Sequence, residues 1–383
     1  MPPAAPRLRG LGLAALLSAS PVLLGDTRAP LPLDGFAAGI QHWAKSHGAD
    51  YPRLAPDDIG GIAANLLLYQ RTNGGWREND DPLRILSAEE RAAVAAARPR
   101  TDTSFDNDAT CPQITYLAAA FQLTGDDEYR AAARRGLEFV FNAQHASGAW
   151  PHSYPETAAY RGRLTFADAV TPNVLRLLHA VAAGAEPFGW TGPALRARAR
   201  AAAERGDAAV LRLQIRQGGR PTGWAGQYDP DTLAPAQGRS FELPAIVSRE
   251  TVEVLRYLMS LESPPPELVA AVEAGARWLR ESALHGWRLE RTATEPIRYR
   301  FHTATEDVRL VADPAAPPLW ARFYDLETNL PVLADRSGDR VASFDQIEHE
   351  RRTGYDWYGH WPAVLLETEL PAWRARLVSP ASP

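Results

Sequence analysis

The sequence predicts an all-α fold, an α/α toroid in which inner and outer helices alternate. The first observation is a repeat: Trp76, Trp150 and Trp224 are spaced 74 residues apart. Each ends a glycine-containing phrase that follows a stretch with apolar residues at helical spacing. The second observation is that few segments alternate polar and apolar residues with period two, so little sheet is expected. Repeats that bury a common face stack or close into a ring.

The predicted helices fall before and between these phrases. The phrases are Gln70–Trp76, Gln144–Trp150 and Gln217–Trp224, with a weaker fourth at His285-Gly286-Trp287. The helices before them are predicted at Ile59–Tyr69, Tyr129–Phe141, Ala203–Ile215 and Ala271–Leu284. The helices between them are predicted at Cys111–Leu123, Thr171–Ala183 and Leu243–Leu261. Each tryptophan is expected to pack over a helix end, and each glycine to permit the tight turn.

The helical pattern stops after residue 290, where proline, arginine and aromatic residues dominate up to about residue 362. Ile297–Phe301 and Ala321–Tyr324 are the best strand candidates in this stretch. We therefore expect an irregular C-terminal wrap with short strands over one face of the ring.

Composition and charge exclude several classes of protein. The chain has 383 residues, of which 45% are hydrophobic and 23% charged, and its formal net charge is −5. These are ordinary globular values without the basic field of a nucleic-acid binder. A single cysteine, Cys111, excludes an intramolecular disulfide and a cysteine-based zinc site. Because Lys45 is the only lysine, any cationic site must consist almost wholly of arginine.

The N-terminus has the pattern of a secretory signal peptide. Arg7 and Arg9 precede the apolar run Leu11–Leu24, and small residues follow. We predict a signal peptide at residues 1–28, a single domain at 29–383, and a secreted or periplasmic location. The alternative is an uncleaved anchor at the membrane surface. After cleavage we expect a monomer that binds neither membrane nor nucleic acid.

Two acidic clusters precede predicted helices. Asp106, Asn107 and Asp108 are consecutive, and Asp168 lies 62 residues after Asp106. In a ring, the two clusters would occupy equivalent loop-to-helix junctions on one face. Short oxygen ligands that converge in this way suit a hard cation such as Ca²⁺. The alternative is that they are independent helix caps, where Asp and Asn are favoured.

Arginines supply the other candidates. Arg249 lies between Ser248 and Glu250 in a predicted inner helix, where the plain alternative is a buried structural ion pair. Arg322 and Arg336 flank a turn that contains proline, and their planar guanidinium groups could hold carboxylates. Near the C-terminus, Glu350–Trp361 interleaves arginine with aromatic residues such as Tyr355. That pattern suits an acidic polysaccharide, or else a structural clasp on the ring.

Seven segments, in this order, resemble polysaccharide lyase family 10, the pectate lyases with an (α/α)₃ toroid. They lie between Ile62 and Pro362 and read GGW, TSFDNDAT, GAWPHSYP, LTFADAV, SRE, ARFYDLETNLPVLADR and ERRTGYDWYGHWP. The resemblance implies cleavage of α-1,4-polygalacturonate by β-elimination with Ca²⁺ as cofactor. It also implies that Arg249 is the base and that Arg322 and Arg336 hold substrate carboxylates. The implied calcium ligands are Asp106, Asn107 and Asp168.

The chain departs from the family pattern at three positions. Glu78 stands where the family usually has a basic residue, Ala167 where it has Asn, and Asp108 adds a charge beside the implied calcium. Two further functions therefore stay open: a lyase for another uronate polymer, and a non-catalytic binder of acidic polysaccharide. The phrases Gln70–Trp76 and Gln144–Trp150 also fit a pattern known in triterpene cyclases, but an arginine-rich cleft and a secretory signal disfavour that function.

Overall fold

The computed structural model describes residue 1, residues 29–300 and residues 302–378. Apart from residue 1, the predicted signal peptide therefore lies outside the described residues. Among these residues, no helix combines the length and the apolar character that crossing a bilayer requires.

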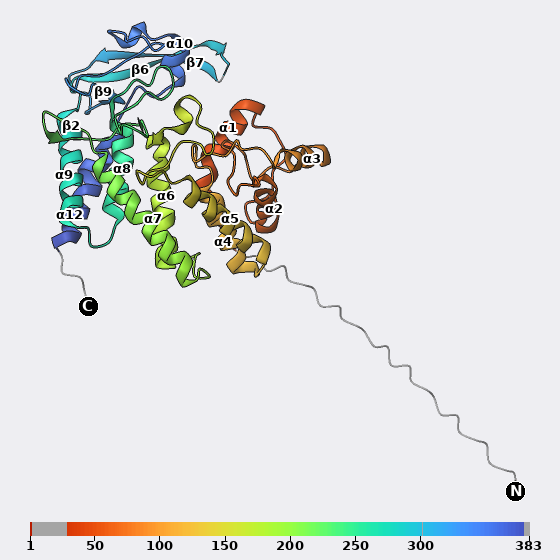
Figure 1. Ribbon diagram of the computed structural model, residues 1–383. Helices are drawn as coiled ribbons and strands as arrows, with labels where there is room; N and C mark the ends of the chain where they lie inside the picture. The colour runs from red at the N-terminus through yellow and green to blue at the C-terminus, as the bar shows by residue number, and fades with distance from the viewer. Residues whose placement is uncertain (2–28, 301, 379–383) are drawn as a thin grey trace.

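Three antiparallel helical hairpins form the body of the protein (Figure 1). They are α4 (Cys111–Thr124) with α5 (Asp127–Ala143), α6 (Val170–Ala183) with α7 (Pro193–Arg212), and α8 (Ser248–Ser260) with α9 (Pro266–Glu281). The first helix of each pair contacts its counterpart in the next pair, so α4, α6 and α8 form the inner row. Gly125 and Gly184 end α4 and α6 in the left-handed conformation, which glycine adopts without strain.

Shorter helices flank the hairpins. On one side, α2 (Ile59–Tyr69) packs on α4 and α5, accompanied by α1 (Ala37–His47) and α3 (Ala88–Ala97). On the other side, α11 (Trp361–Val364) packs on α8, and α12 (Leu370–Val378) completes the chain. The predicted repeat of helical hairpins is therefore present.

The repeated tryptophans fasten the helices to one another. Each is buried, and its indole N–H donates a hydrogen bond to a main-chain carbonyl of the preceding helix. The pairs are Trp76–Leu66 at 2.8 Å, Trp150–Val140 at 2.9 Å and Trp224–Val210 at 2.8 Å. The other side of each ring lies against a glycine of the next outer helix, as Trp150 does on Gly206, where a Cβ would come within 2.9 Å of the ring. This contact explains why glycine stands inside a helix.

The repeated glutamines show that the third phrase begins earlier than the predicted Gln217. Gln70 and Gln144 each donate to two main-chain carbonyls, one in the following turn and one in the next outer helix. In the third repeat this role belongs to Gln214, at 2.8 and 2.9 Å, and not to Gln217. The strands β2 (Arg216–Gln217) and β3 (Arg220–Pro221) form an inserted hairpin that shifts the spacing. The glutamines and tryptophans that suggested a cyclase thus have a structural role.

The fourth phrase was assigned to the wrong tryptophan, because a longer insertion separates Trp287 from the equivalent position. Trp287 is 42% exposed, and its expected place is taken by Trp320, whose indole donates to the Leu279 carbonyl at 2.7 Å. Between them, β6 (Trp287–Arg298) and β7 (Thr303–Ala312) form an antiparallel hairpin. Most β6 side chains are exposed on both faces, so the segment lacks the alternation that predicts a strand. The sequence therefore indicated only its end, at Ile297–Phe301, and Phe301 lies outside the described residues.

The C-terminal part covers one end of the helical array, as predicted. Figure 1 shows β6, β7 and α10 (His349–Gly354) above the hairpins. The candidate strand Ala321–Tyr324 is part of two short strands, β8 (Trp320–Ala321) and β9 (Phe323–Tyr324). They pair with β10 (Tyr358–Gly359) and β5 (Ile246–Val247) respectively. Two small pairs remain: β1 (Leu164–Thr165) with β4 (Gln227–Tyr228), and β2 with β3.

One predicted helix begins later than the sequence indicates. We predicted a helix at Leu243–Leu261, but the helix does not begin before Ser248, because Ile246 and Val247 form β5, which pairs with β9. As a result α8 begins at Ser248, and Arg249 lies at its N-terminal end rather than in its interior.

Trp150→Ala is expected to destabilise the protein by about 3–5 kcal/mol, because it leaves a large cavity and removes an indole hydrogen bond. Urea unfolding followed by circular dichroism measures the change. Trp287→Ala is the matched control, since that ring is half exposed, and its effect should stay within about 0.5 kcal/mol. Equal losses in both variants would contradict the fastening role of the buried tryptophans.

Candidate active site

A cleft of about 770 Å³ lies beside the N-terminal ends of the inner helices. Six of the seven predicted site residues line it: Asp106, Asn107, Asp168, Arg249, Arg322 and Tyr355. They come from the segments before α4 and α6, from the first turn of α8 and from two C-terminal segments. The seventh, Arg336, lines an adjoining cavity of about 870 Å³. The structure therefore brings together residues that lie far apart in the chain.

The acidic clusters occupy equivalent junctions, directly before α4 and α6. The chain there adopts left-handed backbone conformations, with φ of 49° at Asn107 and 48° at Asp168. The N-cap residues of α4 and α6 are Thr110 and Ala169. Within the described ranges, neither helix has a capping hydrogen bond from the side chain of its N-cap residue. The geometry thus disfavours the helix-cap alternative, since neither aspartate caps its helix.

The surroundings shift the pKa values of Asp106 and Asp168 in opposite directions. Burial, and next the negative charge of Asp106, raise the pKa of Asp168 to about 6. Burial also opposes ionisation of Asp106, but the hydrogen bond and charge of His152 outweigh it and lower the pKa of Asp106. Burial raises the pKa of Asp108 as well, with a contribution from Asp106. A cation placed among these carboxylates would relieve both the burial cost and the repulsion.

Arg249 and Glu250 point in different directions from the start of α8. Glu250 is buried and accepts a hydrogen bond from Arg322 at 2.5 Å. Arg249 is 38% exposed in the cleft and lies 3.9 Å from Asp356. The buried ion pair that the sequence suggested as an alternative therefore exists, but it joins Glu250 to Arg322 and leaves Arg249 facing the cleft.

Arg322 and Tyr355 line the same cleft as the aspartates. The Arg322 guanidinium lies 4.7 Å from the centre of the Tyr355 ring, and the Tyr355 hydroxyl donates to Glu242 at 2.8 Å. Arg239 pairs with the same Glu242 at 3.0 Å. Burial opposes ionisation of Glu242, yet the charge of Arg239 lowers its pKa. These contacts hold two cations in fixed positions beside the cleft.

The cavity that Arg336 lines is surrounded by cationic side chains. Lys45, Arg239, Arg298, Arg300 and Arg351 also line it, and none of its described lining residues is acidic. Arg336 donates to Glu350 at 3.3 Å. Because this cavity shares His42, Lys45, Arg239, His302 and Gly354 with the main cleft, the two form one continuous surface.

The sequence model of the pectic acid lyase family matches residues 70–366. The chain belongs to this family. A search of the curated proteins finds no match. Among solved structures, a family 10 polysaccharide lyase from Cellvibrio cellulosa is 27% identical, with a TM-score of 0.68 over 90% of this chain and 99% of that one.

A mutant of the Cellvibrio cellulosa lyase in complex with trigalacturonic acid is also similar. It is 26% identical, with the same TM-score and the same coverage. Together these matches confirm the α/α toroid and make this pectic acid lyase family member a polysaccharide lyase.

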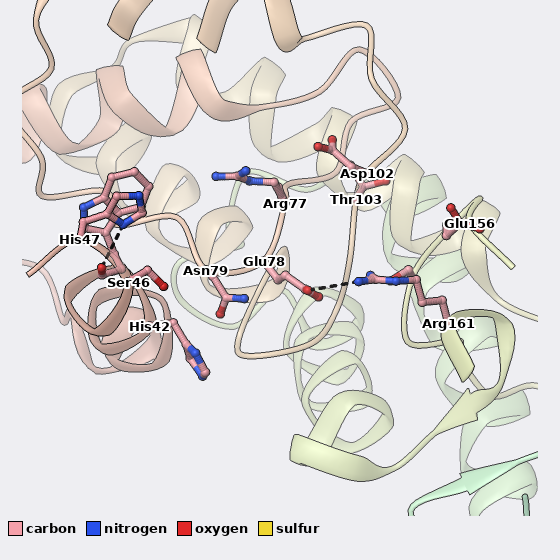
Figure 2. A pocket seen from close by; sticks show the side chains of 12 residues that line it. His42, Ser46, His47, Arg77, Glu78, Asn79, Asp102, Thr103, Glu156 and Arg161 are labelled. Carbon is pink, nitrogen blue, oxygen red and sulfur yellow. Dashed lines mark hydrogen bonds and ion pairs between the residues drawn. The ribbon is translucent and has the colours of Figure 1, made fainter. Parts of the chain in front are cut away.

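Several residues that line these cavities or contact their acids were missed from the sequence. Arg239 lies in an irregular loop that carries no helical or strand pattern. Lys45 lies in α1, outside the repeats. Glu78 was noted only as a departure, yet it lines a third cavity, of about 510 Å³, and pairs with Arg161 at 3.7 Å (Figure 2). His152 stands in the quoted phrase GAWPHSYP, and its contact with Asp106 joins two different loops.

Proposed function

We propose that this protein is a calcium-dependent pectate lyase that cleaves α-1,4-polygalacturonate by β-elimination with Arg249 as the base. The observation that carries the proposal is the convergence of six predicted residues on one cleft. A similar lyase structure holds trigalacturonic acid, which supports an acidic polysaccharide as the substrate. The signal peptide predicted for residues 1–28 supports a secreted or periplasmic location.

The donor set at the acidic junctions fits calcium. Asp106, Asn107 and Asp168 offer side-chain oxygen ligands, which Ca²⁺ prefers. The two aspartates lie close enough that the charge of Asp106 raises the pKa of Asp168. We therefore propose these three residues as the calcium ligands. Calcium bound there would neutralise the uronate carboxylate and stabilise negative charge that develops on it.

Arg249 is the cleft arginine best placed to take the proton from C5 of the uronate. Arg322 is held by Glu250 and Arg239 by Glu242, whereas the ion pair of Arg249 within the described part of the chain is the looser contact with Asp356. An arginine removes a proton only while its guanidine is neutral. Arg322 with Tyr355 then orients the sugar through its carboxylate and ring.

Mass spectrometry of the products tests the type of reaction. Eliminative cleavage leaves an unsaturated uronate, so each new fragment pair lacks the added water that hydrolysis supplies. The proposal predicts unsaturated fragments from polygalacturonate. Saturated fragments, heavier by one water, would contradict it.

Arg336→Ala is expected to raise KM for the polymer about 3- to 10-fold, with kcat little changed, because one charge-assisted contact outside the reacting position is lost. Initial rates over a range of polygalacturonate concentrations measure this effect. Arg340→Ala is the control, since Arg340 is 60% exposed and pairs with Asp325 away from the cavity. An unchanged KM in Arg336→Ala would remove Arg336 from substrate binding.

A second candidate function rests on Glu78. Its carboxylate lies in the cavity next to the main cleft, which Asp102 and Glu156 also line (Figure 2). Two arginines, Arg77 and Arg161, line this cavity too, so a bound uronate would meet acids as well as cations there, unlike in the cavity of Arg336. This observation favours a different uronate polymer, or one whose carboxylates are esterified. Rates measured on polygalacturonate, on methyl-esterified pectin and on other uronate polymers would separate these substrates.

A further inference from the structure

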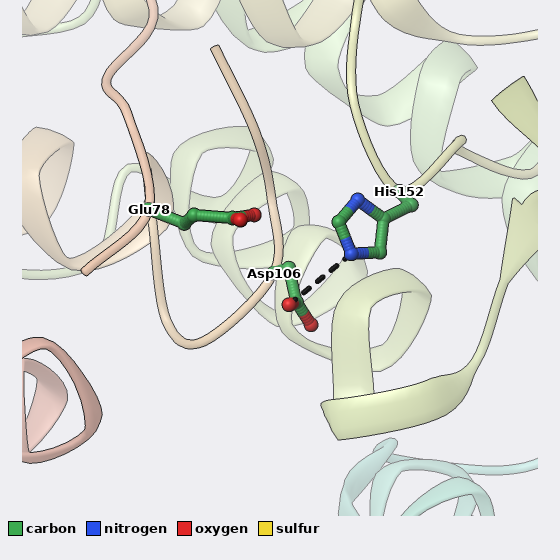
Figure 3. Close-up of side chains that lie close together, drawn as sticks. All are labelled: Glu78, Asp106 and His152. Carbon is green, nitrogen blue, oxygen red and sulfur yellow. Dashed lines mark ion pairs between the residues drawn. The ribbon is translucent and has the colours of Figure 1, made fainter. Parts of the chain in front are cut away.

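Glu78, Asp106 and His152 bring three metal-ligating side chains together beside the proposed calcium site (Figure 3). One ligand atom of each lies within 4.8 Å of the other two. The closest pair is His152 Nε2 and Asp106 Oδ2, at 3.1 Å. In Figure 3 the Glu78 carboxylate extends toward the other two side chains.

Main-chain hydrogen bonds hold the three loops in place. Ser104 donates its amide hydrogen to the Trp76 carbonyl at 2.9 Å, which joins the Asp106 loop to the Glu78 loop. Phe105 donates its amide hydrogen to the His152 carbonyl at 2.9 Å, which joins the Asp106 loop to the third loop. The backbone therefore fixes the relative positions of the three loops that carry these side chains.

The cluster also contains an unsatisfied acceptor. Asp106 and His152 are largely buried. One Glu78 oxygen lies 3.7 Å from Arg161, whereas the other, Oε2, is buried and finds no hydrogen-bond partner in the part of the chain that the structure describes. A buried carboxylate oxygen without a partner carries a substantial desolvation cost, which a bound cation would remove.

Both ring nitrogens of His152 have a polar neighbour. Nδ1 lies 2.8 Å from the Ser153 hydroxyl, and Nε2 lies 3.1 Å from Asp106 Oδ2. In the tautomer that carries its hydrogen on Nδ1, Ser153 accepts that hydrogen and Nε2 offers a lone pair to a metal ion. A metal-bound histidine commonly donates its other N–H in this way.

We propose that Glu78, Asp106 and His152 bind a divalent transition metal ion such as Zn²⁺ at a second site that shares Asp106 with the proposed calcium site. Imidazole nitrogen suits Zn²⁺ and its neighbours, whereas Ca²⁺ takes oxygen ligands. Two atoms about 2.0 Å from a tetrahedral Zn²⁺ are about 3.3 Å apart, close to the distance between His152 and Asp106. Three protein ligands leave a fourth position for water or a substrate oxygen.

Co²⁺ titration of the purified protein, in saturating calcium at neutral pH, tests this site. Co²⁺ is the probe because its visible absorption reports nitrogen and oxygen ligation, whereas Zn²⁺ is colourless. We expect one Co²⁺ per chain, displaced by Zn²⁺. Glu78→Gln should weaken Co²⁺ binding at least about 10-fold, since removing even an outer-shell partner has that effect. His152→Asn should do the same.

Two control variants test whether Co²⁺ binds at this cluster or at other acidic residues nearby. Glu156→Gln makes the same chemical change at an exposed acid that lines the same cavity as Glu78, so it should leave Co²⁺ affinity unchanged. Asp168→Asn changes only the proposed calcium site and should also leave it unchanged. Circular dichroism checks that Glu78→Gln, the less buried position, remains folded.

The result that overturns the proposal is Co²⁺ binding that is absent, or that is equally strong in wild type and Glu78→Gln. Binding lost in Asp168→Asn but kept in Glu78→Gln would overturn it as well, since the ion would then sit among the calcium ligands. The readout is metal binding alone, so the outcome is independent of whether the protein cleaves polygalacturonate.

Discussion

Arg249→Ala is expected to lower kcat on polygalacturonate by at least about 10³-fold while uronate binding changes little. A positioned general base contributes roughly 10²–10⁴-fold, and the cleft offers no second arginine with comparable freedom among its described residues. Arg322, which we expect to hold a substrate carboxylate, stays in place through Glu250. The ground-state complex should therefore survive the change.

Turnover and trigalacturonate affinity, measured on the same preparation, separate these two effects. Arg309→Ala is the control, because that side chain is 67% exposed on β7 and lies outside the cleft. Turnover within a factor of two of wild type in Arg249→Ala would remove Arg249 from the base role. Loss of affinity without loss of kcat would make it a binding residue instead.

Asp168→Asn is expected to raise the calcium concentration needed for half-maximal activity about 100-fold or more. The change keeps the shape of the side chain and removes one of two ligand charges, and ligand charge strongly tunes calcium affinity. Activity titrated with calcium, beside direct calcium binding by calorimetry, measures the shift.

The same substitution should not destabilise the calcium-free protein. Burial and Asp106 raise the pKa of Asp168 to about 6, so its ionised form is disfavoured in the folded state and opposes folding above that pH. Removing the charge should therefore leave the melting temperature in chelator equal or higher at neutral pH. An unchanged calcium requirement would make the assignment of Asp168 as a ligand wrong.

The sequence predicted the helical hairpins and the convergence of the acidic residues on one face, because both follow from the repeat. Each tryptophan phrase returns the chain to the same face, so Asp106 and Asp168 meet although 62 residues separate them. The repeat also predicted buried tryptophans, and the hydrogen bonds of Trp76, Trp150 and Trp224 have the same form.

Features set by contacts between non-repeating segments could not be predicted. The pairing of β5 with β9 decides where α8 begins, and hence that Arg249 faces the cleft while Glu250 is buried. The β6–β7 hairpin is exposed on most of its length, so its side chains carry no alternation. The contact of His152 with Asp106 joins two loops that no sequence pattern relates.

The measurement that tests the central claim most directly is the ultraviolet absorbance of unsaturated uronate when the protein acts on polygalacturonate. We predict a steady rise in the presence of calcium, its arrest by a chelator, and its return when calcium is added in excess. A protein that binds the polymer without any rise would be a non-catalytic binder. A rise that continues in chelator would contradict the calcium assignment.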